Sequence, residues 1–381
     1  MATSGDAGPE DGVGSAETAA NAGIANLATP PLPGKEIAGS GLHAIQPPLA
    51  AGRCRRYPVR PFVPVAREAP MSALICGSLA YDTIMVFPDQ FKNHILPDKV
   101  HILNVSFLVP RMRREFGGCA GNIAYNLKLL GGDPIPMATV GADFGPYREW
   151  FIEQGIRLDQ VKVIDELFTP QAFITTDLDN NQITAFHPGA MMRSYENHVR
   201  AVPGVTIGIV SPDGRDGMLQ NANEFAEAGI PFIFDPGQAM PLFNGAELRH
   251  FIEQAQYVTV NDYESNLLQE RTGWGEQEIA GKVKAYIITR GPQGAEIHAD
   301  STTHRVPPAH ERRVTDPTGC GDAFRAGLIF GIEKGYDWMT IGRMGNLMGA
   351  LKVEHPGTQN QRFDYEDFAG QFRQQFGYAL A

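Results

Sequence analysis

A short glycine-containing segment carries the residues best suited to phosphate chemistry. The segment DPTGCGDAF occupies residues 316–324, and an apolar run follows it directly. The backbone N–H groups of Gly319, Cys320 and Gly321, at the start of the expected helix, could converge on one spot and bind an anion. Asp322 follows in the first helical turn, where it could accept a proton from an attacking hydroxyl group. The alternative interpretation is a plain helix start with a favourable acid.

The rest of the sequence excludes several other kinds of site. No Walker A loop occurs, the cysteines form no CxxC pair, and no Cys/His cluster has the spacing of a zinc site. The net charge of −11 argues against nucleic acid as the main partner, because binding it needs a concentrated basic surface. No apolar run approaches the roughly 20 residues that span a membrane. Free thiols predict a reducing compartment, and we expect the cytoplasm.

Alternating strands and helices must position this segment. The strand candidates are residues 73–78, 135–141, 206–211, 231–237, 257–261 and 286–291. The helix candidates between them are residues 119–132, 147–155, 214–229 and 244–255. Near-continuous apolar strands that alternate with helices predict an α/β fold with a central, mostly parallel sheet covered by helices on both faces. Catalytic turns of such folds lie at the carboxyl ends of the strands.

Two segments break this alternation. Residues 99–109 have strand character, and residues 171–189 have the pattern of two strands around an Asn180-Asn181 turn. We therefore expect a small β-sheet beside the α/β body, formed by residues 82–112 and 168–190 with approximate bounds. This sheet could act as a lid that excludes water from a reacting site. An exposed lid strand could also pair with a second copy of the chain to form a homodimer.

Residues 1–70 differ from the body in composition. They are rich in proline, alanine and glycine and show no hydrophobic periodicity. Such a segment buries too little apolar surface to offset its ordering entropy, so we expect a disordered N-terminal extension before a domain over residues 71–381. The alternative is that the natural protein begins at Met71.

Five motifs in order resemble those of the ribokinase-like carbohydrate and nucleoside kinases. In DPTGCGDAF, Pro317 stands where threonine is commonest in that family and Cys320 where alanine is. The other four motifs are GSLAYD (77–82), GGCAGN (117–122), NDYE (261–264) and TRGPQG (289–294). Within the family the chain is similar to the bacterial adenosine kinases, through FRAG after Asp322, SFLV (106–109), FHPGAM (186–191) and GTQ (357–359). The resemblance implies a ribokinase-like fold.

The resemblance also implies a nucleoside site. The residues that would contact the nucleoside are Asp82, Ser106, Gly117, Gly118, Asn122, Phe173 and Phe186. Asp82 is an acceptor-only side chain suited to neighbouring ribose hydroxyls. Phe173 and Phe186, on facing strands of the hairpin, would contact the purine, and stacking of a base on aromatic rings contributes roughly 1–3 kcal/mol per base. The alternatives are a turn acid at Asp82 and phenylalanines that only hold the lid together.

The same resemblance implies an ATP site and its ions. The residues that would lie near ATP are Asn261, Thr289, Gly291, Gly294 and Asn346. Glu264 would organise a hydrated Mg²⁺ through water, because this ion dehydrates reluctantly; the alternative is a surface helix acid. Family members often need a monovalent cation such as K⁺, and the candidate neighbours here are Asp316, Thr318 and Gly357.

These expectations combine into one reaction. We expect ATP-dependent phosphorylation of the 5′-hydroxyl of a nucleoside, with adenosine as the favoured acceptor and purine salvage as the role. Asp322 would be the general base, and the turn amides with Mg²⁺ would hold the migrating charge. Alternatives are a broad nucleoside kinase that accepts inosine, guanosine or cytidine, a sugar kinase for ribose or fructose, and a nucleoside-binding sensor without activity.

Overall fold

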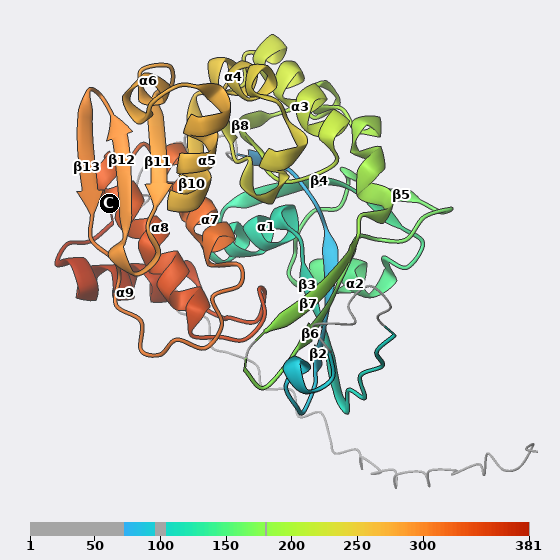
Figure 1. The fold of residues 1–381 in the computed structure, drawn as a ribbon. Helices are drawn as coiled ribbons and strands as arrows, with labels where there is room; N and C mark the ends of the chain where they lie inside the picture. The colour runs from blue at the N-terminus through green and yellow to red at the C-terminus, as the bar shows by residue number, and fades with distance from the viewer. Residues whose placement is uncertain (1–71, 96–103, 180, 381) are drawn as a thin grey trace, which may run out of the picture. The chain divides into compact units, whose positions relative to one another are not determined.

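The larger sheet contains the apolar strands expected from the sequence. The computed structural model describes residues 72–95, 104–179 and 181–380, and the tail predicted over residues 1–70 lies outside them. The strands are β1 (Ser72–Cys76), β4 (Asp133–Gly141), β5 (Val161–Ile164), β8 (Val205–Val210), β9 (Phe232–Phe234), β10 (Tyr257–Asn261), β11 (Ala285–Thr289), β12 (Ala295–Ala299) and β13 (Thr302–Val306). Within the described ranges their order is β13-β12-β11-β10-β9-β8-β1-β4-β5 (Figure 1). The pairs β11–β12 and β12–β13 are antiparallel and the others parallel, which confirms the mostly parallel sheet.

Helices cover both faces of this sheet, as the alternation in the strands requires. In β1, Ala73 and Ile75 belong to one buried cluster, and Leu74 and Cys76 to another. The helices packed in the first cluster are α1 (Cys119–Leu129), α2 (Gly145–Glu153), α7 (Cys320–Glu333), α8 (Trp338–Val353) and α9 (Tyr365–Phe376). Those in the second are α3 (Arg215–Ala228), α4 (Gly245–Gln254), α5 (Asp262–Thr272) and α6 (Glu276–Ala280). The predicted three-layer α/β fold is therefore confirmed.

A smaller sheet lies beside the α/β body (Figure 1). Its strands are β2 (Ala80–Val86), β3 (Arg111–Gly117), β6 (Gln171–Thr176) and β7 (Gln182–His187), in the order β3-β2-β6-β7. The predicted hairpin is confirmed, since β6 and β7 are antiparallel neighbours. In the connecting turn, the carboxylate of Asp177 accepts hydrogen bonds from the backbone N–H groups of Asp179 and Asn181 at 2.9 and 2.8 Å. Asn180, the first residue of the predicted turn, lies outside the described residues.

The strand character expected for residues 99–109 is wrong for the part that the structure describes. Residues 104–109 have no regular secondary structure, and the strand of this region is β3, from Arg111 to Gly117. The first four residues of β3 are exposed and three of them are arginines, so β3 lacks the apolar signal on which the expectation rested.

Short helical turns complete the described chain. Segments of 3₁₀ helix lie at Phe91–Asn93, Gly189–Glu196, Val199–Ala201, Gly237–Leu242 and Gly291–Gln293. No helix among the described residues has both the length and the apolar character needed to cross a lipid bilayer.

Candidate functional site

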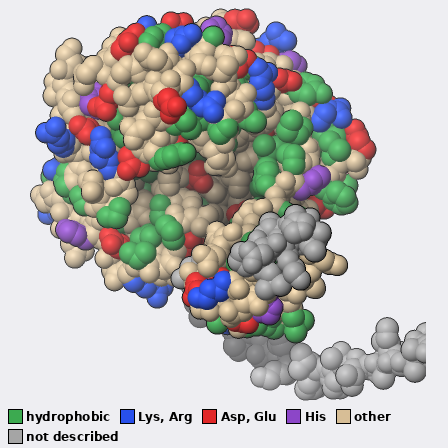
Figure 2. Space-filling model, in the orientation of Figure 1, with side chains coloured by type: hydrophobic (Ala, Val, Ile, Leu, Met, Phe, Trp, Pro, Cys, Tyr) green, Lys and Arg blue, Asp and Glu red, His purple; other side chains and the backbone are tan. Residues whose placement is uncertain are grey.

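The face of the molecule shown in Figure 2 contains a hollow. This face is indented near its centre, and acidic side chains are visible at the bottom of the indentation. In the same orientation, Figure 1 shows α7 and α1 behind the hollow and the small sheet beside it. The helices α1 and α7, which begin at Cys119 and Cys320, therefore lie in the region of this hollow.

The backbone at the start of α7 leaves several amides available for an anion. Gly319 is the N-cap and has a φ of 79°, a left-handed conformation that favours glycine. The N–H of Cys320 donates to the carbonyl of Pro317 at 3.2 Å, whereas the first helical bond runs from the N–H of Ala323 to the carbonyl of Gly319 at 3.0 Å. No described residue accepts from the N–H of Gly319, Gly321 or Asp322. These three amides are therefore free to donate to an anion, while the amide of Cys320 is partly engaged in the turn.

The carboxylate of Asp322 is held by a chain of side-chain amides. Its Oδ2 accepts a hydrogen bond from Asn122 Nδ2 at 2.8 Å. Asn122 Oδ1 in turn accepts from Gln359 Nε2 at 3.1 Å, and the same Nε2 donates to the hydroxyl of Tyr147 at 2.6 Å. Gln359 therefore fixes the orientation of the Asn122 amide, so that its NH₂ group points at Asp322. This network joins residues that lie 200 positions apart in the chain.

A buried ion pair lies next to Asp322. Arg325, one helical turn further along α7, donates through Nη2 to Asp235 Oδ1 at 2.6 Å and makes a second contact through Nε to Oδ2. The two residues are 7% and 2% exposed, so the pair is shielded from water. Burial raises the pKa of Asp322 to about 7, and the positive charge of Arg325 opposes that rise. A carboxyl with a pKa near neutrality is suited to exchange a proton with a substrate.

Asp82 lies at the base of the small sheet, against the glycines that open α1. A Cβ atom at Gly117 would lie 2.5 Å from Asp82 Oδ2, so only glycine fits there without moving the carboxylate. Gly118 has a φ of 85° and approaches the carbonyl of Ser78 closely. Burial, with Glu115 nearby, raises the pKa of Asp82 to about 6. The negative charge of Asp82 also contributes to the raised pKa of Asp322, so the two predicted site residues lie close enough to interact.

The two phenylalanines of the hairpin do not lie on the same side of the small sheet. Phe186 pairs with Ala172, which pairs with Asp82, so Phe186 and Asp82 share a face. Phe173 pairs with Ala185, one register position away, and therefore points to the opposite face. Both rings are exposed, at 40% for Phe173 and 52% for Phe186. The register therefore places the two rings on opposite faces of the hairpin, and contact of either ring with a purine stays a prediction.

Ser106 is not brought into this group. It is exposed in the irregular segment 104–109. Its neighbour Phe107 packs on Phe87 and Phe91, with ring centroids 4.8 and 5.0 Å apart, beyond the end of β2 that lies furthest from Asp82. The role expected for Ser106 stays a prediction.

The residues expected near ATP gather at the carboxyl ends of β10 and β11. Asn261 and Thr289 are register partners at these two strand ends. Gly291 and Gly294 have φ values of 52° and 89° in the turn that follows, where the N–H of Gly294 donates to the carbonyl of Gly291 at 3.0 Å. Asn346, on α8, donates through Nδ2 to the carbonyl of Pro307 at 2.8 Å and so tethers the loop after β13. They lie at the strand ends where ligands of parallel sheets bind.

Glu264 has a clear local function as a helix cap. Asn261 Oδ1 accepts from the N–H of Glu264 at 2.7 Å, and Glu264 Oε2 accepts from the N–H of Asn261 at 2.8 Å. The NDYE motif is therefore a capping box at the start of α5. Burial and the neighbouring Asp235 raise the pKa of Glu264. A half-buried carboxylate close to further acids fits a hydrated Mg²⁺, which prefers oxygen ligands and keeps its own water.

The residues expected to surround a monovalent cation bond to one another. Asp316 Oδ1 accepts from the N–H of Thr318, and its Oδ2 from the N–H of Gly357, both at 2.9 Å. Thr318 and Gly357 thus present donors rather than acceptors in these contacts. The backbone carbonyl of Asp316 accepts from Lys352 Nζ at 2.6 Å. A charged side chain of the protein therefore contacts the carbonyl of one of the three expected residues, and binding of a monovalent ion there stays a prediction.

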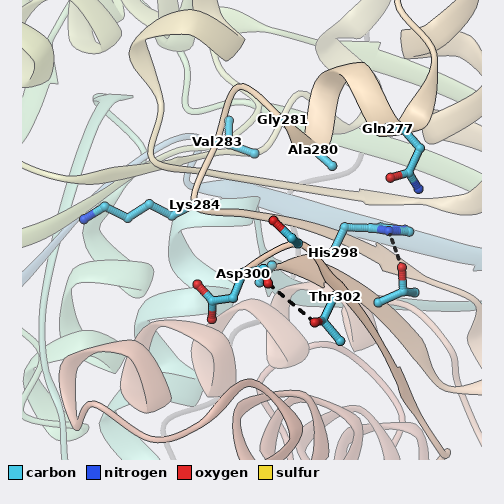
Figure 3. A pocket seen from close by; sticks show the side chains of 11 residues that line it. Gln277, Ala280, Gly281, Val283, Lys284, His298, Asp300 and Thr302 are labelled. Carbon is cyan, nitrogen blue, oxygen red and sulfur yellow. Dashed lines mark hydrogen bonds between the residues drawn. The ribbon is translucent and has the colours of Figure 1, made fainter.

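A second polar pocket lies away from these residues (Figure 3). Its volume is about 400 Å³, and its lining includes Gln277, Lys284, His298, Asp300 and Thr302. The pocket is lined by the turn between β12 and β13, which follows Ala299. Because Ala299 pairs with Ala285, the first residue of β11, the pocket lies at the amino end of β11. Within this lining, His298 Nε2 lies 2.8 Å from Glu276 Oε1, and on the same strand Glu296 Oε2 lies 2.8 Å from Arg290 Nη2. These acids already have partners, and we assign the pocket no part in the phosphate site.

Several residues of the site were missed by the sequence analysis. Arg325, Asp235 and Lys352 were given no role, and neither were Tyr147 and Gln359. Two of them carried a signal. Arg325 is a charged residue inside an apolar helix, and Asp235 follows a buried strand directly, at the strand end where sites of parallel sheets lie.

Comparisons with known proteins agree with this geometry. The model of the pfkB family carbohydrate kinases matches residues 81–363. The nucleoside kinase of Methanocaldococcus jannaschii is 30% identical over 258 residues, which cover 67% of this chain and 85% of that protein. The nucleoside kinase of Burkholderia thailandensis in complex with inosine is 54% identical, with a TM-score of 0.74 over 81% of this chain and 99% of that one. Its complex with ADP-inosine is 56% identical, with a TM-score of 0.72 over 81% and 97%. The chain therefore belongs to the pfkB family of carbohydrate kinases, enzymes that transfer a phosphoryl group to a hydroxyl group.

Proposed function

We propose that this protein phosphorylates the 5′-hydroxyl of a purine nucleoside with ATP. The observation that carries the proposal is the start of α7, where Asn122 holds the Asp322 carboxylate beside amides that no described residue occupies. Nucleoside kinases named among its relatives support the acceptor class, as does the ADP-inosine complex of the Burkholderia protein. Adenosine is the acceptor that we expect first, and inosine is the second.

Each group at the site has a separate part in this reaction. Asp322 accepts the proton of the 5′-hydroxyl while that oxygen attacks the γ-phosphorus, and Asn122 keeps the carboxylate in position. The amides of Gly319, Gly321 and Asp322 stabilise negative charge on the phosphoryl group in transit. Mg²⁺ bound with ATP supplies further neutralisation of the phosphates, and Glu264 is the residue that would hold it through water.

The small sheet supplies the part of the site that recognises the acceptor. Asp82 offers acceptors to two neighbouring ribose hydroxyls, and Gly117 lets the carboxylate lie close to the backbone. Phe186 shares the face of Asp82 and is therefore the ring that we assign to the purine. We propose that this sheet closes as a lid over the nucleoside and excludes water.

The test of the reaction is the Asp322→Asn variant, measured by ADP release with adenosine and with inosine. Loss of the general base should lower kcat by about 10²–10⁴, with ADP binding unchanged. The matched control is Asp216→Asn, which alters an exposed acid in the first turn of α3. Near-normal turnover of the Asp322 variant would remove this residue from the mechanism.

The test of the acceptor class uses the two faces of the small sheet. Phe186→Ala should lower kcat/KM for adenosine by about tenfold, in line with roughly 1–3 kcal/mol for a stacked base, and leave the use of free ribose unchanged. Phe173→Ala is the matched control on the opposite face and should leave the adenosine-to-ribose ratio unchanged. Equal losses with adenosine and ribose for Phe186→Ala would favour the sugar kinase alternative.

The opposite face of the small sheet carries several exposed apolar side chains, beside the exposed Arg114. Met112 is 69%, Phe173 40% and Ile183 44% exposed, and their register places them on one face. We propose that two copies of the chain pair through this sheet. Light scattering on the full chain tests this proposal, and a monomer at all protein concentrations would contradict it.

A further inference from the structure

Lys352 is a buried lysine that the proposed reaction does not use. It lies in the last turn of α8 and is 0% exposed. Its Nζ donates to the backbone carbonyl of Asp316 at 2.6 Å and to that of His355 at 3.2 Å. A lysine is rarely buried fully without a carboxylate in direct contact, so two carbonyl acceptors are an unusual environment for an ammonium group.

The surroundings of Lys352 are those of a cation site. Burial lowers the pKa of Lys352, while Asp316, Cys320, Asp322 and Glu115 favour its charged form. Backbone carbonyls with nearby carboxylates are hard oxygen ligands of the kind that also bind alkali cations. The ammonium group therefore occupies the position, beside residue 316, where the sequence predicted a monovalent ion.

Lys352 also connects the phosphate-binding turn to the rest of the site. Asp316 begins this turn, and its carboxylate bonds Thr318 within the turn and Gly357 outside it. Next along the chain, Thr358 donates to the carbonyl of Phe116 at 2.5 Å, at the end of β3. The Lys352 ammonium group thus fixes the carbonyl of Asp316 at the start of the turn. The free amides of Gly319 and Gly321 lie at the end of the same turn.

We propose that the ammonium group of Lys352 takes the place of a bound monovalent cation, so that phosphoryl transfer by this protein does not depend on K⁺. The positive charge orders the 316–319 backbone and keeps the amides of Gly319 and Gly321 directed at the phosphate. Lys352 is a positioning residue, since it acts through the turn rather than on the reacting atoms. The kinetic test of this inference rests on the proposed function, because it measures phosphorylation of adenosine. The binding test measures only the affinity for ADP and does not need that reaction.

The first test compares cations with the unaltered protein. ADP release with adenosine and ATP-Mg²⁺ is measured in tetramethylammonium chloride and in KCl at equal ionic strength. We expect the rates of ADP release in the two salts to agree within about twofold. If the Lys352 ammonium group fills the cation site, K⁺ has no site to bind and cannot change the rate. An increase of tenfold or more in KCl would overturn the proposal.

The second test is the Lys352→Met variant, with Lys334→Met as the control, because Lys334 is exposed at the end of α7. We expect Lys352→Met to lose at least tenfold in kcat without K⁺ and to recover part of that loss in KCl or ammonium chloride. Rescue by a cation of matching charge is a result that a purely structural role would not give. Loss of activity in a folded variant without any rescue would contradict the proposal.

A binding measurement separates this inference from the proposed reaction. Calorimetric titration with ADP-Mg²⁺ needs no turnover, so it is informative even if no nucleoside is phosphorylated. We expect the same ADP affinity with and without K⁺ for the unaltered protein, and K⁺-dependent affinity for Lys352→Met. Should Lys352→Met not fold, K⁺-independent ADP binding by the unaltered protein supports the proposal and K⁺-dependent binding overturns it.

Discussion

The buried pair of Arg325 and Asp235 makes a prediction that separates stability from catalysis. Arg325→Met removes the only charge that the structure places against Asp235 at hydrogen-bond distance among the described residues. Asp235 is 2% exposed, so its carboxylate would be left without water or a partner. Breaking a buried ion pair in this way destabilises a protein by about 3–5 kcal/mol.

The double variant Arg325→Met with Asp235→Leu distinguishes the two roles. Replacing both partners by apolar residues of similar volume is often neutral or stabilising, so most of the lost stability should return. Activity near neutral pH should return only in part, because the double variant loses both Arg325, which lowers the pKa of Asp322, and Asp235, which raises that pKa by less. The acid limb of kcat/KM should move upward by about one pH unit for each 1.4 kcal/mol of attraction that is lost.

The assays are urea unfolding for stability and kcat/KM for adenosine between pH 5.5 and 9. We expect the single variant to be unstable and poorly active, and the double variant to be stable but only partly active near neutral pH. A stable double variant with an unchanged pH profile would refute the idea that Arg325 tunes Asp322.

Three further predictions concern protons, glycine and metal. Burial raises the pKa of Asp322 to about 7, and the general base must be ionised to accept a proton. The kcat/KM of the unaltered protein should therefore fall about tenfold per pH unit below pH 7. A flat profile down to pH 5 would contradict this prediction. Gly117→Ala would place a Cβ atom 2.5 Å from Asp82 Oδ2 and so displace this carboxylate. Overpacking costs about 1–3 kcal/mol, so the KM for adenosine should rise by about tenfold with little change in kcat. An unchanged KM would show that Asp82 does not hold the ribose. Glu264→Gln keeps the capping box of α5 but removes the negative charge, so the Mg²⁺ concentration for the half-maximal rate should rise while thermal stability stays constant. The control is Glu247→Gln in the capping box of α4, which should change neither quantity.

The chain's local patterns predicted the fold class because each pattern reports on its own surroundings. Apolar runs such as residues 257–261 show burial on both faces, and glycines after helices mark helix ends. The strand β3 escaped this kind of analysis, since its exposed arginines carry no apolar signal.

The sequence by itself determined the family resemblance, the α/β fold and the glycine-flanked Asp322, because these depend on residues that are neighbours in the chain. Only the tertiary structure decided that Asn122 and Gln359 orient Asp322, that Phe173 and Phe186 face opposite ways, and that Lys352 donates to the carbonyl of Asp316. Each of these contacts joins segments distant in sequence or depends on strand register, and a shift of one residue in register reverses the face of every side chain.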